Sequence, residues 1–195
     1  AKKMGLPINK LHIATNQNDI LHSSINHGLM KKNVVKQTYS PSMDIQISSN
    51  FERQLFECAG RESDVIKNLF QEFSKNNSYT FDKNILDNLQ SIYSTNAVSD
   101  DETLSTINQI NKQYNYLADP HTSTGLYVLL EKDASQPWVS LACAHPAKFG
   151  DAIEKAIGNS PIMPKVLSKL FDKEEKITIL DNNKEDLKSL ILSNI

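Results

Sequence analysis

Several features that mark common classes of protein are scarce or missing in this sequence. It contains only two cysteines, Cys58 and Cys143, which lie far apart and lack metal-ligand spacing, as expected in a reducing compartment. No apolar run approaches the roughly 18 residues that a membrane-spanning helix needs. The first ten residues, AKKMGLPINK, lack the apolar centre of a signal peptide. We therefore expect a cytoplasmic protein with no membrane partner.

An excess of positive charge is also missing. The chain has 21 Lys and Arg residues against 23 Asp and Glu residues, a net charge of -2, and no concentrated basic stretch, so we do not expect nucleic acid as a partner. None of the histidines shows HExxH-type spacing or an adjacent acidic cluster, so we expect no metal site. The histidines are His12, His22, His27, His121 and His145.

What is present indicates an α/β fold. With 195 residues, of which 39% are hydrophobic, the chain can bury a core of its own. Short β-type runs at 11–14, 138–144 and 176–181 alternate with helical patterns near 51–59, 119–132, 146–158, 164–171 and from 184 onward. This alternation predicts a partial parallel sheet flanked by helices.

One block of the sequence is predicted to be helical throughout. Between residues 61 and 116, apolar residues recur at helical spacing, and Ser99 followed three residues later by Glu102 matches a capping box. We therefore predict a helical insertion at 51–116. The segments 1–50 and 117–195 are then predicted to form one α/β domain.

Three polar clusters follow a predicted strand or precede a predicted helix: Thr15–Asp19, Asp119–Thr122 and Cys143–His145. The carboxyl ends of parallel strands meet at one edge of a sheet, where ligands bind. Each cluster also has an ordinary explanation as a turn, a helix cap or a core cysteine. A nucleophilic pair of Cys143 and His145 is a further alternative, because side chains two apart on a strand share a face.

Four stretches in order resemble a known family: AKKMGLPINKLHIATNQNDIL, SPSMDIQISSNFERQLFE, YLADPHTSTG and CAHPAKFGDAIEKAIG. They are similar to the carboxyl-terminal half of threonine synthase, in the branch with a helical insertion that is found in many bacteria and in fungi. The resemblance implies a cofactor domain of pyridoxal phosphate (PLP) fold type II. It also implies conversion of O-phospho-L-homoserine and water to L-threonine and phosphate.

The resemblance implies that two elements of the family's site lie outside this chain. The family's Schiff-base lysine occurs in a Phe-Lys-Asp context that this sequence lacks. Its glycine-rich loop of the SGNFG type precedes the helix that ends in AKKMGLP, so we expect the chain to begin inside that helix. The expected partner is therefore the missing amino-terminal half of the same enzyme, and we expect the isolated segment to be inactive.

The resemblance also assigns site residues. The family commonly shows Thr-Ala-His-Pro-Ala-Lys-Phe, with the threonine hydroxyl at the pyridine nitrogen of PLP, and Cys143 stands at that position. The cofactor-binding residues are then expected to be Cys143, Thr15 and Asn16, with no catalytic residue in this chain. The stretch Asp119–Thr122 would begin a helix whose amino end faces the cleft and suits an anionic group. The residues expected to line the cleft are Asn18, Asp19, Ser42, Asp44, His121, Thr122 and His145.

Two alternatives remain beside the synthase. The first is a non-catalytic binding or scaffold module that descends from the enzyme. The second is another PLP lyase of the same fold, such as a threonine dehydratase, although the SPSMDIQISSNFER block disfavours this. For the synthase, the resemblance implies that His145 and Pro146 fix the turn from strand to helix rather than perform catalysis.

Overall fold

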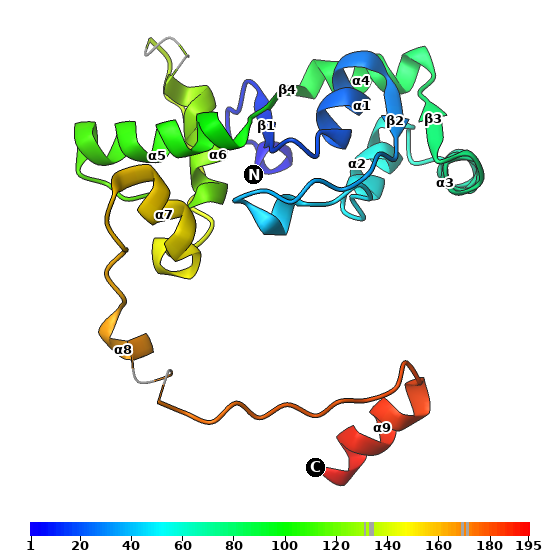
Figure 1. Ribbon diagram of the computed structural model, residues 1–195. Coiled ribbons are helices and arrows are strands. Elements are labelled where there is room, and N and C mark those ends of the chain that lie inside the picture. Colours follow the sequence, from blue (N-terminus) through cyan, green and yellow to red (C-terminus); the bar gives the residue numbers. More distant parts are fainter. Residues whose placement is uncertain (131, 133–134, 169, 171) are drawn as a thin grey trace. The chain divides into compact units, whose positions relative to one another are not determined.

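The computed structural model describes residues 1–130, 132, 135–168, 170 and 172–195 of the chain (Figure 1). These residues form two compact units, 1–161 and 162–195. The first unit opens with the short 3-10 helix η1 (Lys2–Met4), which ends at Gly5 with a left-handed φ of 94°. The predicted end of a helical segment at Gly5 is therefore confirmed.

A parallel pair of strands forms the centre of the first unit. Strand β1 (Leu11–Thr15) pairs with β4 (Tyr93–Ala97), in a register that runs from Leu11 opposite Tyr93 to Thr15 opposite Ala97. Helices α1 (Ile20–His27) and α6 (Pro120–Leu130) contact β1, and α1 also contacts β4. In Figure 1 the pair lies between a group formed by α1 to α4 and a group formed by α5 to α7. The predicted α/β class, with a parallel pair flanked by helices, is confirmed.

The main hydrophobic core lies in the first of these groups. It joins α1 to α2 (Phe51–Cys58), α3 (Ser63–Asn76) and α4 (Lys83–Ile92), and a short antiparallel pair of β2 (Leu29–Lys31) and β3 (Ser78–Thr80) covers one end. Its members are Ile20, Ile25, Met30, Phe51, Leu55, Cys58, Ile66, Leu69, Phe73, Phe81, Ile85 and Leu89.

Gly28 allows α1 and α4 to approach closely at the edge of this core. It ends α1 with a φ of 69°, and a Cβ atom there would lie 2.9 Å from Leu86 Cδ2. Both the backbone conformation and the space therefore favour glycine at this position.

Helix α5 (Asp100–Tyr114) begins with the predicted capping box. The Ser99 hydroxyl accepts a hydrogen bond from Glu102 N–H, and the Glu102 carboxylate accepts one from Ser99 N–H at 2.7 Å. The Ser99 N–H, its hydroxyl and the hydroxyl of Tyr127 together lower the pKa of Glu102. Helix α5 packs against α6 and α7 (Gly150–Ile157) and carries a second group of buried side chains.

Two predicted strands are wrong. Residues 138–144 and 176–181 form no strand, and the first segment is not buried, since Val139 is 84% and Leu141 is 78% exposed. A β-strand exists only through hydrogen bonds to a neighbour, and among the described residues no strand lies beside either segment. Apolar, β-branched composition is therefore not enough to make a strand here.

The predicted all-helical block is also wrong in part. Residues 61–116 contain β3 and the whole of β4, so one strand of the parallel pair comes from within the predicted insertion. Tyr93 and Thr95 are good strand formers, but polar neighbours hide the alternation that would reveal β4. The proposed domain boundaries stay a prediction.

The second unit, residues 162–195, contains α8 (Lys165–Ser168) and α9 (Lys184–Ser193). The Asn183 side chain accepts a hydrogen bond from Glu185 N–H and so caps α9, as the predicted helix from residue 184 requires. The predicted helix at 164–171 is confirmed at 165–168, while residues 169 and 171 lie outside the described part. None of this unit's described residues is buried. Across the described chain, no helix has the length and apolarity to cross a bilayer.

Candidate functional site

Asp119 organises the start of α6. Its Oδ1 accepts hydrogen bonds from the backbone N–H groups of His121 at 2.9 Å and Thr122 at 3.4 Å, so the side chain caps the helix. The side chains of Asp119, His121 and Thr122 are all buried. These N–H groups point to the helix's own carboxylate. The two N–H groups at the amino end of α6 are thus hydrogen-bonded to Asp119, and the expected contact with an anionic group stays a prediction.

The second carboxylate oxygen of Asp119 reaches a distant segment. Asp119 Oδ2 accepts hydrogen bonds from the Thr122 hydroxyl and from Ala144 N–H, the latter at 3.1 Å. The Thr122 hydroxyl in turn accepts a hydrogen bond from Cys143 N–H at 2.8 Å. The polar clusters predicted at 119–122 and 143–145 therefore lie together and are joined by hydrogen bonds.

The Cys143 side chain points away from the core. The thiol is free and exposed, and it donates a long hydrogen bond of 3.5 Å to Leu141 O. His145 does not pair with it, because His145 Nδ1 accepts a hydrogen bond from Ala147 N–H and begins the short helix η3 (Pro146–Phe149). The alternative of a Cys143–His145 nucleophilic pair therefore lacks the contact it needs, and Cys143 is not a core cysteine.

His121 connects α6 to a loop that includes the short helix η2 (Pro41–Met43). His121 Nε2 lies 3.1 Å from Ser42 N, and because a backbone N–H only donates, Nε2 is the acceptor. The ring proton then sits on Nδ1, which lies 3.2 Å from Asp119 Oδ1. Phe149 packs on the ring, with the centroids 4.8 Å apart. His121 is therefore held on three sides and positions the backbone at Ser42.

The polar cluster after β1, Thr15–Asp19, forms hydrogen bonds to the same loop. Asn16 Nδ2 donates to Asp44 Oδ1 at 2.8 Å, and Asn18 Nδ2 donates to the same oxygen at 3.0 Å. Asp44 also accepts hydrogen bonds from the Thr38 N–H and hydroxyl, and Ser40 accepts from Asn16. Thr38 and Ser40 were not predicted as members of the site, because no pattern in the sequence connects them with Asn16.

The remaining predicted residues lie around this cluster. Thr15 is buried, with its hydroxyl 3.4 Å from Asn96 O, and Asp19 precedes α1 without a capping side-chain bond. Two of the three predicted polar clusters therefore meet directly, and the third reaches them through residues 38–44. Their predicted roles in binding stay predictions.

In the described part of the chain, no group of three or more His, Cys, Asp or Glu side chains is arranged to hold a metal ion.

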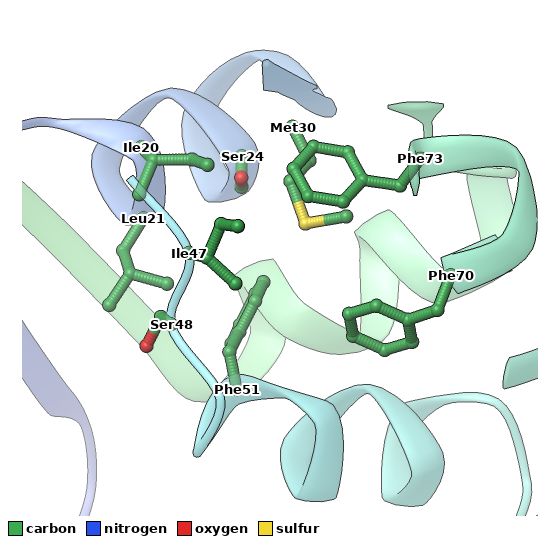
Figure 2. Close-up of a pocket in the computed structure, with 9 residues that line it drawn as sticks. All are labelled: Ile20, Leu21, Ser24, Met30, Ile47, Ser48, Phe51, Phe70 and Phe73. Carbon is green, nitrogen blue, oxygen red and sulfur yellow. The ribbon is translucent and has the colours of Figure 1, made fainter. Parts of the chain in front are cut away.

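Two hollows lie away from these residues. Figure 2 shows the first, inside the main core, where Phe51, Phe70 and Phe73 face Ile20 and Met30. Its volume of about 10 Å³ is about that needed for one water molecule, so it is too small for an organic ligand. The second, of about 450 Å³, is an open groove between α5 and α6 that includes Glu102 and Tyr127. Neither is lined by a residue predicted to bind a ligand.

Comparisons with known proteins agree on one family. A family described as "Threonine synthase, C-terminal" matches residues 122–191. Threonine synthase from Pseudomonas aeruginosa is 39% identical over 185 residues, covering 93% of this chain and 39% of that protein. The enzyme of the same name from Saccharomyces cerevisiae is 36% identical over 207 residues, covering 93% of this chain and 40% of that protein.

Solved structures extend the match to the fold. PLP-bound threonine synthase from Brucella melitensis superposes with a TM-score of 0.89 at 41% identity, over 98% of this chain and 41% of that one. The chain corresponds to the carboxyl-terminal region of threonine synthases. Yeast threonine synthase gives a TM-score of 0.88 at 36% identity, over 100% of this chain and 44% of that one. The chain thus spans about two fifths of the length of these threonine synthases.

The two cysteines are expected to differ sharply in reactivity. Cys143 is exposed, whereas Cys58 is 5% exposed and burial raises the pKa of its thiol. Because the thiolate is the reactive form, Cys143 should react with an aromatic disulfide reagent about tenfold or more faster than Cys58. Absorbance of the released thiolate measures both phases. Cys143→Thr should remove the fast phase and Cys58→Ala the slow one, whereas two equal rates would contradict this assignment of exposure.

Proposed function

We propose that this chain is the carboxyl-terminal part of a PLP-dependent threonine synthase that acts on O-phospho-L-homoserine and water. The products would be L-threonine and phosphate. The observation that carries the proposal is the superposition of 98% of the chain, at 41% identity, on a PLP-bound threonine synthase. The free cysteines suit the cytoplasm as its location.

The residues at the candidate site fit a neutral contact to the cofactor ring. Asp119 accepts hydrogen bonds from the backbone at His121, Thr122 and Ala144, so its carboxylate is not available to pair with a protonated pyridine nitrogen. The exposed Cys143 thiol is a neutral, weak donor and acceptor at the position where the family shows threonine. A ring nitrogen at Cys143 would therefore meet a neutral partner.

When bound, PLP would supply the electron sink for the chemistry. The residues of this chain would bind and orient. Thr122 and Asp119 fix the backbone on which the Cys143 thiol is presented, while His121 and Asp44 hold the loop around Ser42 that we assign to the substrate entrance.

The proposal assigns the covalent attachment of PLP to the partner half. The Phe-Lys-Asp segment and the glycine-rich loop of the family are absent from these 195 residues. The amino-terminal half of the same enzyme would supply the lysine and the phosphate-binding loop. The isolated chain is then expected to produce no threonine.

A chimera tests the proposal. The stretch of the Pseudomonas aeruginosa enzyme that matches this chain is replaced by residues 1–195, and phosphate release from O-phospho-L-homoserine and threonine formation are measured with added PLP. We expect the chimera to form both products and the isolated chain to form neither. In the chimera, Cys143→Thr should retain activity, and Cys143→Ala should lower it about tenfold because a hydrogen bond to the ring is lost.

Each alternative predicts a different outcome. A folded chimera that binds no PLP and releases no phosphate would favour a non-catalytic module. Formation of a 2-oxo acid from threonine would favour a dehydratase. Threonine formation by the isolated chain would contradict the assignment of the lysine to the partner half.

A further inference from the structure

Asp119 does more than cap a helix. The carboxylate is 1% exposed, and a buried carboxylate is stable only when hydrogen bonds replace its water. One oxygen suffices for the cap, since Oδ1 accepts the N–H groups of His121 and Thr122. The other oxygen, Oδ2, accepts the N–H of Ala144, which is 25 residues away in the sequence. The second oxygen therefore makes a tertiary contact that capping does not need.

The charge of Asp119 also determines how Thr122 bonds to Cys143. A hydroxyl has one proton, and the Thr122 hydroxyl donates it to Asp119 Oδ2. Its lone pairs are then free to accept Cys143 N–H, at 2.8 Å. Asp119 thus holds two successive N–H groups. It bonds to Ala144 N–H directly and to Cys143 N–H through the Thr122 hydroxyl.

The same carboxylate orients the loop around Ser42. Asp119 Oδ1 faces Nδ1 of His121 and so favours the tautomer with its proton there. That tautomer leaves Nε2 free to accept Ser42 N–H at 3.1 Å. Three segments that are far apart in the sequence therefore share one buried anion.

We propose that Asp119 is a positioning residue that fixes the Cys143 thiol and the Ser42 loop relative to each other at the cofactor edge. The proposal rests on the proposed function for the identity of the cofactor. Asp119 touches no reacting atom and acts through Thr122, Ala144 and His121. An amide at position 119 has nearly the same shape, but its NH₂ group cannot accept Ala144 N–H or the Thr122 proton.

Hydrogen–deuterium exchange of the chain tests the positioning directly. The amides of Cys143 and Ala144 lie outside any helix or strand, so we expect their protection to depend on the hydrogen bonds to Thr122 and Asp119. Asp119→Asn should speed exchange at both amides about tenfold or more, while amides within α4 stay protected. Thr122→Val should speed exchange chiefly at Cys143, and Thr122→Ser should restore the original rate. If Asp119→Asn does not fold, Thr122→Val and Thr122→Ser still test whether these hydrogen bonds protect the amide of Cys143.

Glu102→Gln is the matched control. Its carboxylate also accepts a backbone N–H and a hydroxyl, both from Ser99, but at the start of α5. Glu102 also accepts the hydroxyl of Tyr127 on α6, but it makes no hydrogen bond to residues 143 or 144, so exchange there should stay unchanged. Unchanged exchange in Asp119→Asn and Thr122→Val would overturn the proposal, as would equal acceleration by Glu102→Gln.

Cofactor binding by the chimera separates this proposal from the proposed function. The dissociation constant for PLP, measured by its absorbance and fluorescence, should rise about tenfold or more with Asp119→Asn and stay unchanged with Glu102→Gln. Faster exchange with unchanged affinity would overturn the role at the cofactor edge. If the chimera with the natural chain binds no PLP, the proposed function fails. In that case the exchange rates alone still test whether Asp119 and Thr122 hold residues 143 and 144 in place.

Discussion

Replacing Leu89 by alanine lowers the free energy of unfolding of the chain by about 2–5 kcal/mol. Leu89 lies on α4, is 0% exposed and belongs to the cluster that joins α1, α2, α3 and α4. Alanine is the better helix former, so the loss measures packing and the cavity left behind rather than helix propensity. Urea unfolding followed by far-UV circular dichroism gives the difference.

Leu187→Ala is the control for this prediction. Leu187 also lies on a helix, α9, but is 51% exposed. Its replacement should change the unfolding free energy by less than about 0.5 kcal/mol. Similar losses for Leu89→Ala and Leu187→Ala would show that the cluster of α1 to α4 does not form the stable core of this chain.

The contrast between these helices and the strands shows what the sequence predicts well. Helices α3, α4 and α5 depend on contacts within a few residues, and their apolar spacing and the Ser99–Glu102 capping box are visible in the sequence. Strands depend on a neighbour that the sequence does not identify. Strand β4 was missed because only its pairing with β1 defines it, and residues 138–144 were predicted as a strand although no described neighbour pairs with them.

The candidate site follows the same rule. The clusters at Asp119–Thr122 and Cys143–His145 were predicted from their places in the alternation, and the structure joins them. The identity of the hydrogen-bond partners was not predictable, because Asp119 bonds to Ala144, which is 25 residues away in the sequence. Nothing in the sequence indicated that Thr38 and Ser40 would complete the cluster around Asn16. The long-range polar contacts could therefore not be predicted from the sequence, whereas the local polar clusters that make them could.

Replacing Asp44 by alanine should release the loop at 36–46 and destabilise the chain by about 2–4 kcal/mol. Asp44 accepts hydrogen bonds from the Thr38 N–H and hydroxyl and from the side-chain amides of Asn16 and Asn18. Those two amides are 1% and 3% exposed, so water does not readily replace the lost acceptor. Urea unfolding measures the loss of stability, and the rate of tryptic cleavage after the exposed Lys36 measures release of the loop.

Asp87→Ala is the control for this prediction, because it also removes a carboxylate, but one that makes no hydrogen bond to the loop at 36–46. Asp87 pairs with Lys83 on the surface of α4, and an exposed pair of this kind contributes little to stability. It should leave cleavage after Lys36 unchanged, whereas Asp44→Ala should accelerate it. Cleavage at the original rate in Asp44→Ala would mean that the amides of Asn16 and Asn18 find other acceptors. The loop that carries Ser42 would then be held chiefly by His121, so removing that side chain should free it instead.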